Sequence, residues 1–215
     1  MKKYLINLFA LAAVVLTAGT FNARAQRTAL FEIYGTDSTN IVMLGNSLTA
    51  GVDWNELLKN PTVVNRGIVG DDSPAMLKRI ECITAGKPRK IFLMAGVNDI
   101  SHDLTADSVA RAVTKLVDTI MVQTPDSKLY IQSLLPVNNS FGRYKTMIDK
   151  EQTVRDVNVL LKEMAEKKGL TFIDIHDAFC DENGNLKADW TADGLHLLAP
   201  AYVCWRDLLL PYINE

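Results

Sequence analysis

Short apolar runs recur along the chain, and segments with apolar residues at helical spacing separate them. The runs predict five β-strands, at residues 40–44, 62–67, 90–96, 128–135 and 171–176. Helices are predicted at residues 54–59, 73–83, 105–123, 149–168 and 197–213. In the second helix Ser73 is the expected N-cap and Pro74 the first helical residue, and Gly169 ends the fourth helix.

Strands that are apolar throughout and separated by helices are typical of a parallel sheet with helices on both faces. Five such strands predict an α/β fold of three layers, α/β/α, around a flavodoxin-like, doubly wound, five-stranded parallel sheet. No repeat, low-complexity segment or linker divides the chain, so residues 26–215 are expected to form one domain. The irregular segment at residues 136–148 is expected to overhang the ligand site.

The N-terminus follows a different pattern. Lys2 and Lys3 precede an apolar stretch at residues 4–19, and Ala23 and Ala25 follow at the spacing of a cleavage site. This order is typical of a secretory signal peptide, here residues 1–25. The apolar stretch is shorter than the roughly 20 residues that a membrane span needs, so an uncleaved anchor is the less favoured alternative. The mature protein is therefore expected to be exported, periplasmic or secreted, without stable membrane insertion.

Net charge limits the classes of binding partner, and the cysteines indicate whether disulfides are expected. The chain has a net charge of −2, and the charge falls to −5 without residues 1–25, which hold three basic residues and no acid. An acidic chain without a basic run argues against nucleic acid as a partner. Cys82, Cys180 and Cys204 lack C-x-x-C spacing, and two of them lie in helical apolar patterns that favour buried free thiols, so no disulfide is expected. In an oxidising compartment one pair could bridge and leave the third cysteine free.

Glycines and polar residues follow the strands at the edge where an open parallel sheet binds its ligands. The segments are Gly45-Asn46-Ser47, Asn65-Arg66-Gly67, Gly96-Val97-Asn98-Asp99 and, before the last helix, Asp193-Gly194-Leu195-His196. Together they supply a nucleophile, amide donors, a base and an orienting acid, which are the groups that acyl transfer needs.

Each of these residues also has a purely structural explanation. Ser47 could cap a helix and Gly67 could simply end a strand. Asn98 could stabilise a turn, and His196 could lie at the surface near a helix start. The chemical interpretation depends on all four segments occurring in one chain, each at the rim of the same sheet.

The four segments together resemble the blocks of the SGNH, or GDSL-like, hydrolase family, which is named for a serine, a glycine, an asparagine and a histidine. "GNSL" is similar to the first block, "NRGIVGD" to the second, "GVND" to the third and "DGLH" to the last. They extend from Gly45 to His196, across almost the whole predicted domain. The ending "DGLHLLAPAYVCW" is similar to that of the platelet-activating-factor acetylhydrolase-like branch.

The resemblance implies the SGNH hydrolase fold and a serine esterase that needs no cofactor and no metal. Ser47 would be the nucleophile, His196 the base and Asp193 the acid that orients it. The N–H groups of Ser47 and Gly67 and the side-chain amide of Asn98 would form the oxyanion hole. The implied substrate is a short-chain acyl ester, above all an acetyl ester, of a carbohydrate or a small lipid.

One position departs from the family, whose first block usually has aspartate where this chain has Asn46. Asparagine keeps an acceptor oxygen and loses the charge. If the family's acid only braces the turn, Asn46 can replace it. If the acid's charge tunes the serine or the histidine, activity would be reduced.

Two other functions remain open. Asp174, His176 and Asp177 end the last predicted strand and could hold the metal of a phosphoesterase, although no paired-histidine motif supports one. A non-catalytic glycan- or lipid-binding module on the same fold is favoured only by Asn46.

The remaining candidate residues and motifs carry less weight. Asp71 and Asp72, with Ser73, are expected to cap the following helix, and His102 is expected at the site rim at most. The chain contains no G-x-S-x-G motif and no phosphate-binding glycine loop after a strand.

Overall fold

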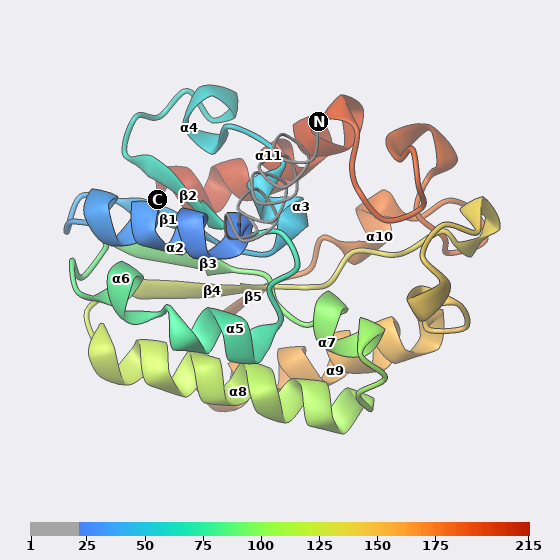
Figure 1. The fold of residues 1–215 in the computed structure, drawn as a ribbon, viewed down its shortest axis with the longest axis horizontal. Helices are drawn as coiled ribbons and strands as arrows, with labels where there is room; N and C mark the ends of the chain where they lie inside the picture. The colour runs from blue at the N-terminus through green and yellow to red at the C-terminus, as the bar shows by residue number, and fades with distance from the viewer. Residues whose placement is uncertain (1–21) are drawn as a thin grey trace, which may run out of the picture.

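The fold is built on one five-stranded sheet, seen in a computed structural model that describes residues 22–215. All strands are parallel, in the order β2-β1-β3-β4-β5 (Figure 1). Their bounds are Ile41–Gly45 (β1), Val63–Gly67 (β2), Lys90–Leu93 (β3), Lys128–Gln132 (β4) and Thr171–Ile173 (β5). This order is that of a flavodoxin-like sheet and confirms the prediction.

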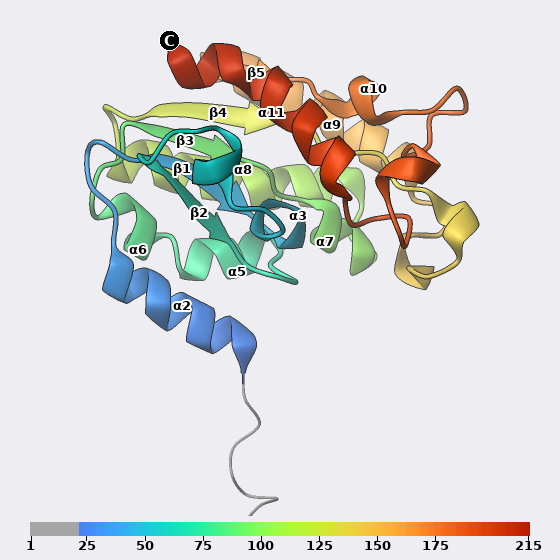
Figure 2. The same ribbon diagram turned by 90° about the horizontal axis from the view of Figure 1, so that it is seen from above.

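Helices cover both faces of the sheet, which confirms the three-layer architecture. On one face lie α3 (Ser47–Ala50), α4 (Trp54–Leu57) and α11 (Ala199–Asn214) (Figure 1 and Figure 2). The other face is covered by α5 (Ser73–Lys78), α8 (Ala106–Gln123) and α9 (Glu151–Lys167), with α8 packed against both neighbours. The remaining elements are α2 (Ala23–Tyr34), α6 (Glu81–Thr84), α7 (Val97–Ser101), α10 (His176–Phe179), η1 (Asn139–Phe141), η2 (Lys145–Met147) and η3 (Ala188–Trp190).

The central strands are buried over their whole length. Every residue of β1 and β3 is buried, which explains why these segments, apart from Lys90, are apolar without alternation. β3, β4 and β5 each end three residues before their predicted ends, where the chain turns into the loops of the site.

The helix predicted at residues 73–83 needs two corrections. It is divided into α5 and α6, because Arg79 has φ −110° and ψ 10° and leaves the helical conformation. Its N-cap is Asp72, whose carboxylate accepts a hydrogen bond from the Ala75 N–H at 2.8 Å. Ser73 lies inside the helix and donates its N–H (3.0 Å) and its hydroxyl (3.1 Å) to the Asp99 carboxylate.

Two glycines let α3 lie across the ends of β1 and β2. A Cβ on Gly45 would lie 2.1 Å from Thr49 Oγ1, and a Cβ on Gly67 would lie 2.4 Å from the Ala50 nitrogen. Neither position has room for a side chain, so glycine is required for this close approach. The packing places Ser47, the first residue of α3, at the rim of the sheet.

The predicted signal peptide, residues 1–25, lies almost wholly outside the described residues. Its last four residues are described and begin α2, where Asn22 Oδ1 accepts a hydrogen bond from the Ala25 N–H at 3.0 Å. Within residues 22–215 no helix combines the length and the apolar character that crossing a membrane requires. The three cysteines are free thiols.

Candidate active site

A cavity of about 240 Å³ opens at the carboxyl ends of the central strands. Its walls come from α3, α7, the loop after β2, the segment around η2 and the loop before α11. The lining residues are Ser47, Val69, Gly70, Val97, Asn98, Ser101, Tyr144, Thr146, Met147, Leu195 and His196. Three of the sequence-predicted site residues, Ser47, Asn98 and His196, therefore share one cavity.

Ser47 is placed by the turn between β1 and α3. Asn46 is fully buried and caps α3, with its Oδ1 accepting a hydrogen bond from the Leu48 N–H at 2.9 Å. The asparagine thus braces this turn as an acceptor. Among the described residues no acceptor contacts the Ser47 N–H, as expected at the start of a helix.

His196 and Asp193 form a hydrogen-bonded series with Ser47. The imidazole Nε2 lies 3.0 Å from Ser47 Oγ, and Nδ1 lies 2.9 Å from Asp193 Oδ2. The second carboxylate oxygen of Asp193 accepts the backbone N–H groups of Leu195 (3.0 Å) and His196 (2.8 Å). An Nδ1–H directed at the carboxylate leaves Nε2 as the acceptor for the serine proton.

The environment of Asp193 favours its ionised form. Burial raises the pKa of the carboxyl, but hydrogen bonds from the His196 side chain, the His196 N–H and the Leu195 N–H outweigh burial, so the pKa lies below its usual range. Asp193 is therefore a carboxylate throughout the range in which an imidazole works as a base.

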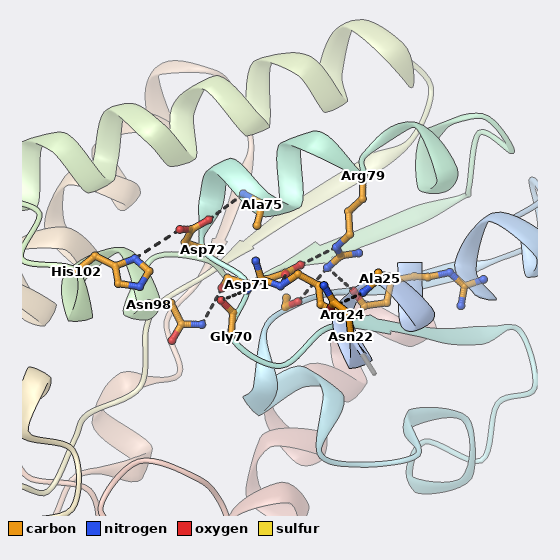
Figure 3. Close-up of polar contacts among 12 residues, drawn as sticks. Asn22, Arg24, Ala25, Gly70, Asp71, Asp72, Ala75, Arg79, Asn98 and His102 are labelled. Atoms are coloured by element: carbon orange, nitrogen blue, oxygen red, sulfur yellow. Dashed lines mark hydrogen bonds and ion pairs between the residues drawn. The ribbon is translucent and has the colours of Figure 1, made fainter. Parts of the chain in front are cut away.

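Asn98, on α7, is held by a backbone carbonyl. Its Nδ2 donates to the Asp71 carbonyl oxygen at 2.8 Å (Figure 3). A side-chain amide has two N–H groups, so one remains for a ligand in the cavity.

A buried ion pair supports the loop that carries this carbonyl. The Arg79 Nε lies 2.7 Å from the Asp71 carboxylate, and the two side chains are 4% and 1% exposed (Figure 3). Arg24 of α2 lies 3.2 Å from the same carboxylate but is 48% exposed. Asp71 is thus not a helix cap, in contrast to the prediction.

The structure does not bring Gly67 into the cavity. Its N–H donates to Asn65 Oδ1 at 2.8 Å, and no part of the residue lines the cavity walls. The glycine that does line them is Gly70, at φ +77° in a turn closed by a 3.2 Å hydrogen bond from the Asp71 N–H to the Ile68 carbonyl. Among residues 22–215 no acceptor contacts the Gly70 N–H.

The segment at residues 136–148 overhangs the cavity, as predicted, and contributes Tyr144, Thr146 and Met147. Sequence reasoning named none of these side chains. The sequence signal was the irregular character of the segment, which does not indicate which of its side chains contact the site.

The alternative metal group is not formed as predicted. The side chain of Asp174 accepts the His176 N–H at 3.1 Å, and within the described chain the potential ligand atoms that lie within 4.8 Å of one another belong to His176, Asp177 and Cys180. These residues line a separate cavity that Ser47 does not reach. His102 lies 3.5 Å from Asp72, is 59% exposed and is absent from the walls of the Ser47 cavity.

Comparison with known proteins identifies the family. Residues 43–203 match the model of the GDSL-like lipase/acylhydrolase family. A curated relative, platelet-activating factor acetylhydrolase IB subunit alpha2 of Rattus norvegicus, is 29% identical over 169 residues, which are 75% of this chain and 70% of that one.

Solved structures share the fold. A protein from Streptococcus pneumonia has a TM-score of 0.83 at 24% identity, covering 95% of this chain and 99% of its own. An acetyl xylan esterase has a TM-score of 0.67 at 17% identity, covering 81% and 99%. The chain belongs to the GDSL-like lipase/acylhydrolase family, and its reaction class is carboxylic-ester hydrolysis.

Proposed function

We propose that this protein hydrolyses short-chain acyl esters through Ser47, His196 and Asp193. Ser47 Oγ attacks the ester carbonyl carbon while its proton passes to His196 Nε2. The carbon–oxygen bond to the alcohol then breaks, and the departing oxygen takes that proton. Water, deprotonated by the same imidazole, releases the acyl group as a carboxylic acid. The observation that carries the proposal is the unbroken series of contacts, 3.0 Å and 2.9 Å long, from hydroxyl to carboxylate.

The oxyanion hole in this proposal consists of the N–H groups of Ser47 and Gly70 and one N–H of Asn98. All three residues line the cavity, and each has a donor with no acceptor among the described residues. Gly70 takes the place that the sequence pattern suggested for Gly67, whose N–H is already engaged. Donors of this kind stabilise the negative oxygen that develops in the transition state.

The substrate proposal follows from cavity size and from the relatives. A cavity of about 240 Å³ is small beside the 300–1,000 Å³ of pockets for drug-sized ligands, and it suits a short acyl group. The curated relative is called an acetylhydrolase, and one structural neighbour is called an acetyl xylan esterase. An acetyl ester of a carbohydrate or a small phospholipid is therefore the proposed substrate.

The chemistry is tested with p-nitrophenyl acetate and with a fluorophosphonate label. The Ser47→Ala variant is expected to lose hydrolysis and labelling, because the nucleophile is absent. Ser108→Ala, on α8 and outside the cavity, controls for the loss of any serine hydroxyl. Hydrolysis by Ser47→Ala at the parent rate would refute the mechanism.

Two further outcomes distinguish the alternatives. A parent protein that hydrolyses no ester in a panel of acyl lengths and acetylated sugars, and that resists the label, would be a binding module. Loss of phosphoesterase activity on chelation would favour the metal enzyme instead.

Export is the second part of the proposal, on the basis of the basic, apolar and small-residue order of residues 1–25. Expression of the full chain in a bacterial host, followed by fractionation and N-terminal sequencing, tests it. A mature N-terminus at Gln26 in the exported fraction is the expected result, and an intact Met1 in the cytoplasm would contradict it.

A further inference from the structure

A tyrosine hydroxyl reaches the acid–base pair from the segment that overhangs the cavity. Tyr144 Oη lies 2.9 Å from His196 Nδ1, and the two rings meet edge to face with centroids 5.4 Å apart. The negative charge of Asp193 acts on the same hydroxyl and, after burial, raises the pKa of Tyr144. Tyr144 thus contacts the imidazole behind the nucleophile, on the nitrogen that also faces Asp193.

The backbone holds this segment firmly against the loop that carries the pair. The Asn138 N–H donates to the Gly194 carbonyl at 2.8 Å, and the Asn138 side chain donates to the Leu186 carbonyl at 2.8 Å. A Cβ on Gly194, which has φ +89°, would lie 2.2 Å from the Asn138 oxygen. At the other end of the segment Met147 is 1% exposed. Tyr144 is therefore presented to the site by a segment anchored on both sides.

The protons on His196 Nδ1 and on Tyr144 Oη determine whether the tyrosine hydroxyl donates or accepts a hydrogen bond here. Neutral imidazole carries one proton, and Nδ1 has two oxygens at 2.9 Å, Asp193 Oδ2 and Tyr144 Oη. A base for Ser47 needs its lone pair on Nε2, so the proton must be on Nδ1. The phenol then has its own proton to donate, and Asp193 is the acceptor beside it.

We propose that Tyr144 is a positioning residue, whose hydroxyl donates to the Asp193 carboxylate and holds the Asp193–His196 pair with Nε2 directed at Ser47. The proposal rests on the proposed function, because it concerns the same base. It goes beyond the three-residue series by assigning a fourth side chain to the orientation of the imidazole.

The expected pH effect follows from the groups that face the imidazole. Among the residues that line the cavity, the only titratable groups are Tyr144 and His196, with Asp193 behind them. Burial and the charge of Asp193 raise the pKa of Tyr144, Arg143, next along the chain, lowers it, and the pKa is raised overall. In the proposed arrangement a hydrogen bond from the Tyr144 hydroxyl partly offsets the negative charge of the Asp193 carboxylate. Its removal strengthens the attraction between Asp193 and a protonated imidazole, which makes the imidazole easier to protonate.

The test compares Tyr144→Phe with Thr146→Val, since each removes one hydroxyl from the cavity wall and only the first contacts the pair. For Tyr144→Phe we expect kcat for p-nitrophenyl acetate to fall about tenfold with little change in KM, the size of one hydrogen bond to a charged group. The acidic limb of the pH profile of kcat/KM is expected to move to higher pH by about half a unit. Thr146→Val is expected to change KM and to leave the acidic limb in place.

A second readout does not need activity. NMR titration of the His196 ring protons, assigned by their loss in His196→Asn, is expected to show a higher midpoint in Tyr144→Phe than in the parent. An equal or lower midpoint, or a KM effect alone, would overturn the proposal, because Tyr144 would then be only a wall of the cavity. Absence of hydrolysis in the parent would refute the proposed function and leave the NMR comparison as the test of Tyr144.

Discussion

Replacing Asp71 by alanine would leave the guanidinium of Arg79 buried without its carboxylate. In the native chain the Arg79 Nε–Asp71 Oδ2 distance is 2.7 Å, and Arg79 Nη2 also donates to the carbonyl oxygens of Gly45 (3.2 Å) and Arg66 (2.9 Å). The pair thus joins the ends of β1 and β2 to the turn that carries Gly70. Burial lowers the pKa of Arg79, with Asp71 opposing that effect.

The expected loss of stability in Asp71→Ala follows from the burial of the ion pair. Both partners are at least 96% buried as side chains, and removal of one partner from such a pair costs about 3–5 kcal/mol. For a domain of this size that is a fall in Tm of roughly 10 °C. Arg24 contributes at most about 1 kcal/mol to the Asp71 site, because its side chain is 48% exposed.

Urea unfolding of four proteins measures the coupling: the parent, Asp71→Ala, Arg79→Met and the double variant. The double variant is expected to lose less stability than the sum of the single variants by about 2 kcal/mol or more, because it leaves no uncompensated charge. Glu163→Ala, which breaks the exposed 3.4 Å pair with Lys167, is the control and should cost less than about 1 kcal/mol. Additive single effects, or an Asp71→Ala cost as small as the control's, would refute this account of the pair.

Three more predictions concern the site. Asn98→Ala removes one donor to the oxyanion and should lower kcat about 10²- to 10³-fold in aryl-ester assays, whereas an unchanged kcat would exclude that role. Gly67→Ala should mainly reduce the denaturation midpoint, because its Cβ would lie 2.4 Å from a backbone nitrogen of α3. Gly70→Ala, whose Cβ would lie 3.3 Å from the flexible Arg24 side chain, should cost less stability and should reduce kcat, because strain at φ +77° would turn the N–H that faces the cavity. The reverse pattern would restore Gly67 as the donor. The pKa of Asp193 is depressed, so its ionised form contributes stability that is present above the unfolded pKa of about 3.9 and is lost as the pH falls through the lower folded value. Asp193→Asn should therefore weaken the dependence of Tm on pH below about 4, and an unaltered acid profile would contradict the depressed value.

Much of the fold could be predicted because apolar character alone identifies a buried parallel strand. β1 and β3 have no solvent face, so their residues are apolar except Lys90, whose ammonium donates to backbone carbonyl oxygens at the end of α11. The division of one predicted helix at Arg79 could not be foreseen, because Arg79 there also bonds to the carbonyl oxygen of Gly45, 34 residues away along the chain. Local preference favoured Ser73 as well as Asp72 as the N-cap of α5. In the structure Ser73 instead donates its N–H and its hydroxyl to the Asp99 carboxylate on α7.

For the site, the sequence by itself determined which kinds of group stand at the strand ends: a serine after β1, an asparagine after β3 and an acid three residues before a histidine. Only the tertiary structure decided which atoms meet. Gly67 and Gly70 belong to one motif, and Asn65 takes up the N–H of the first while a turn with positive φ presents the second to the cavity. Tyr144 reaches His196 Nδ1 from a segment that has no pattern of its own. The physical reason is that residue type and spacing specify local conformation and burial, whereas the direction of a single N–H or hydroxyl depends on partners that are distant along the chain.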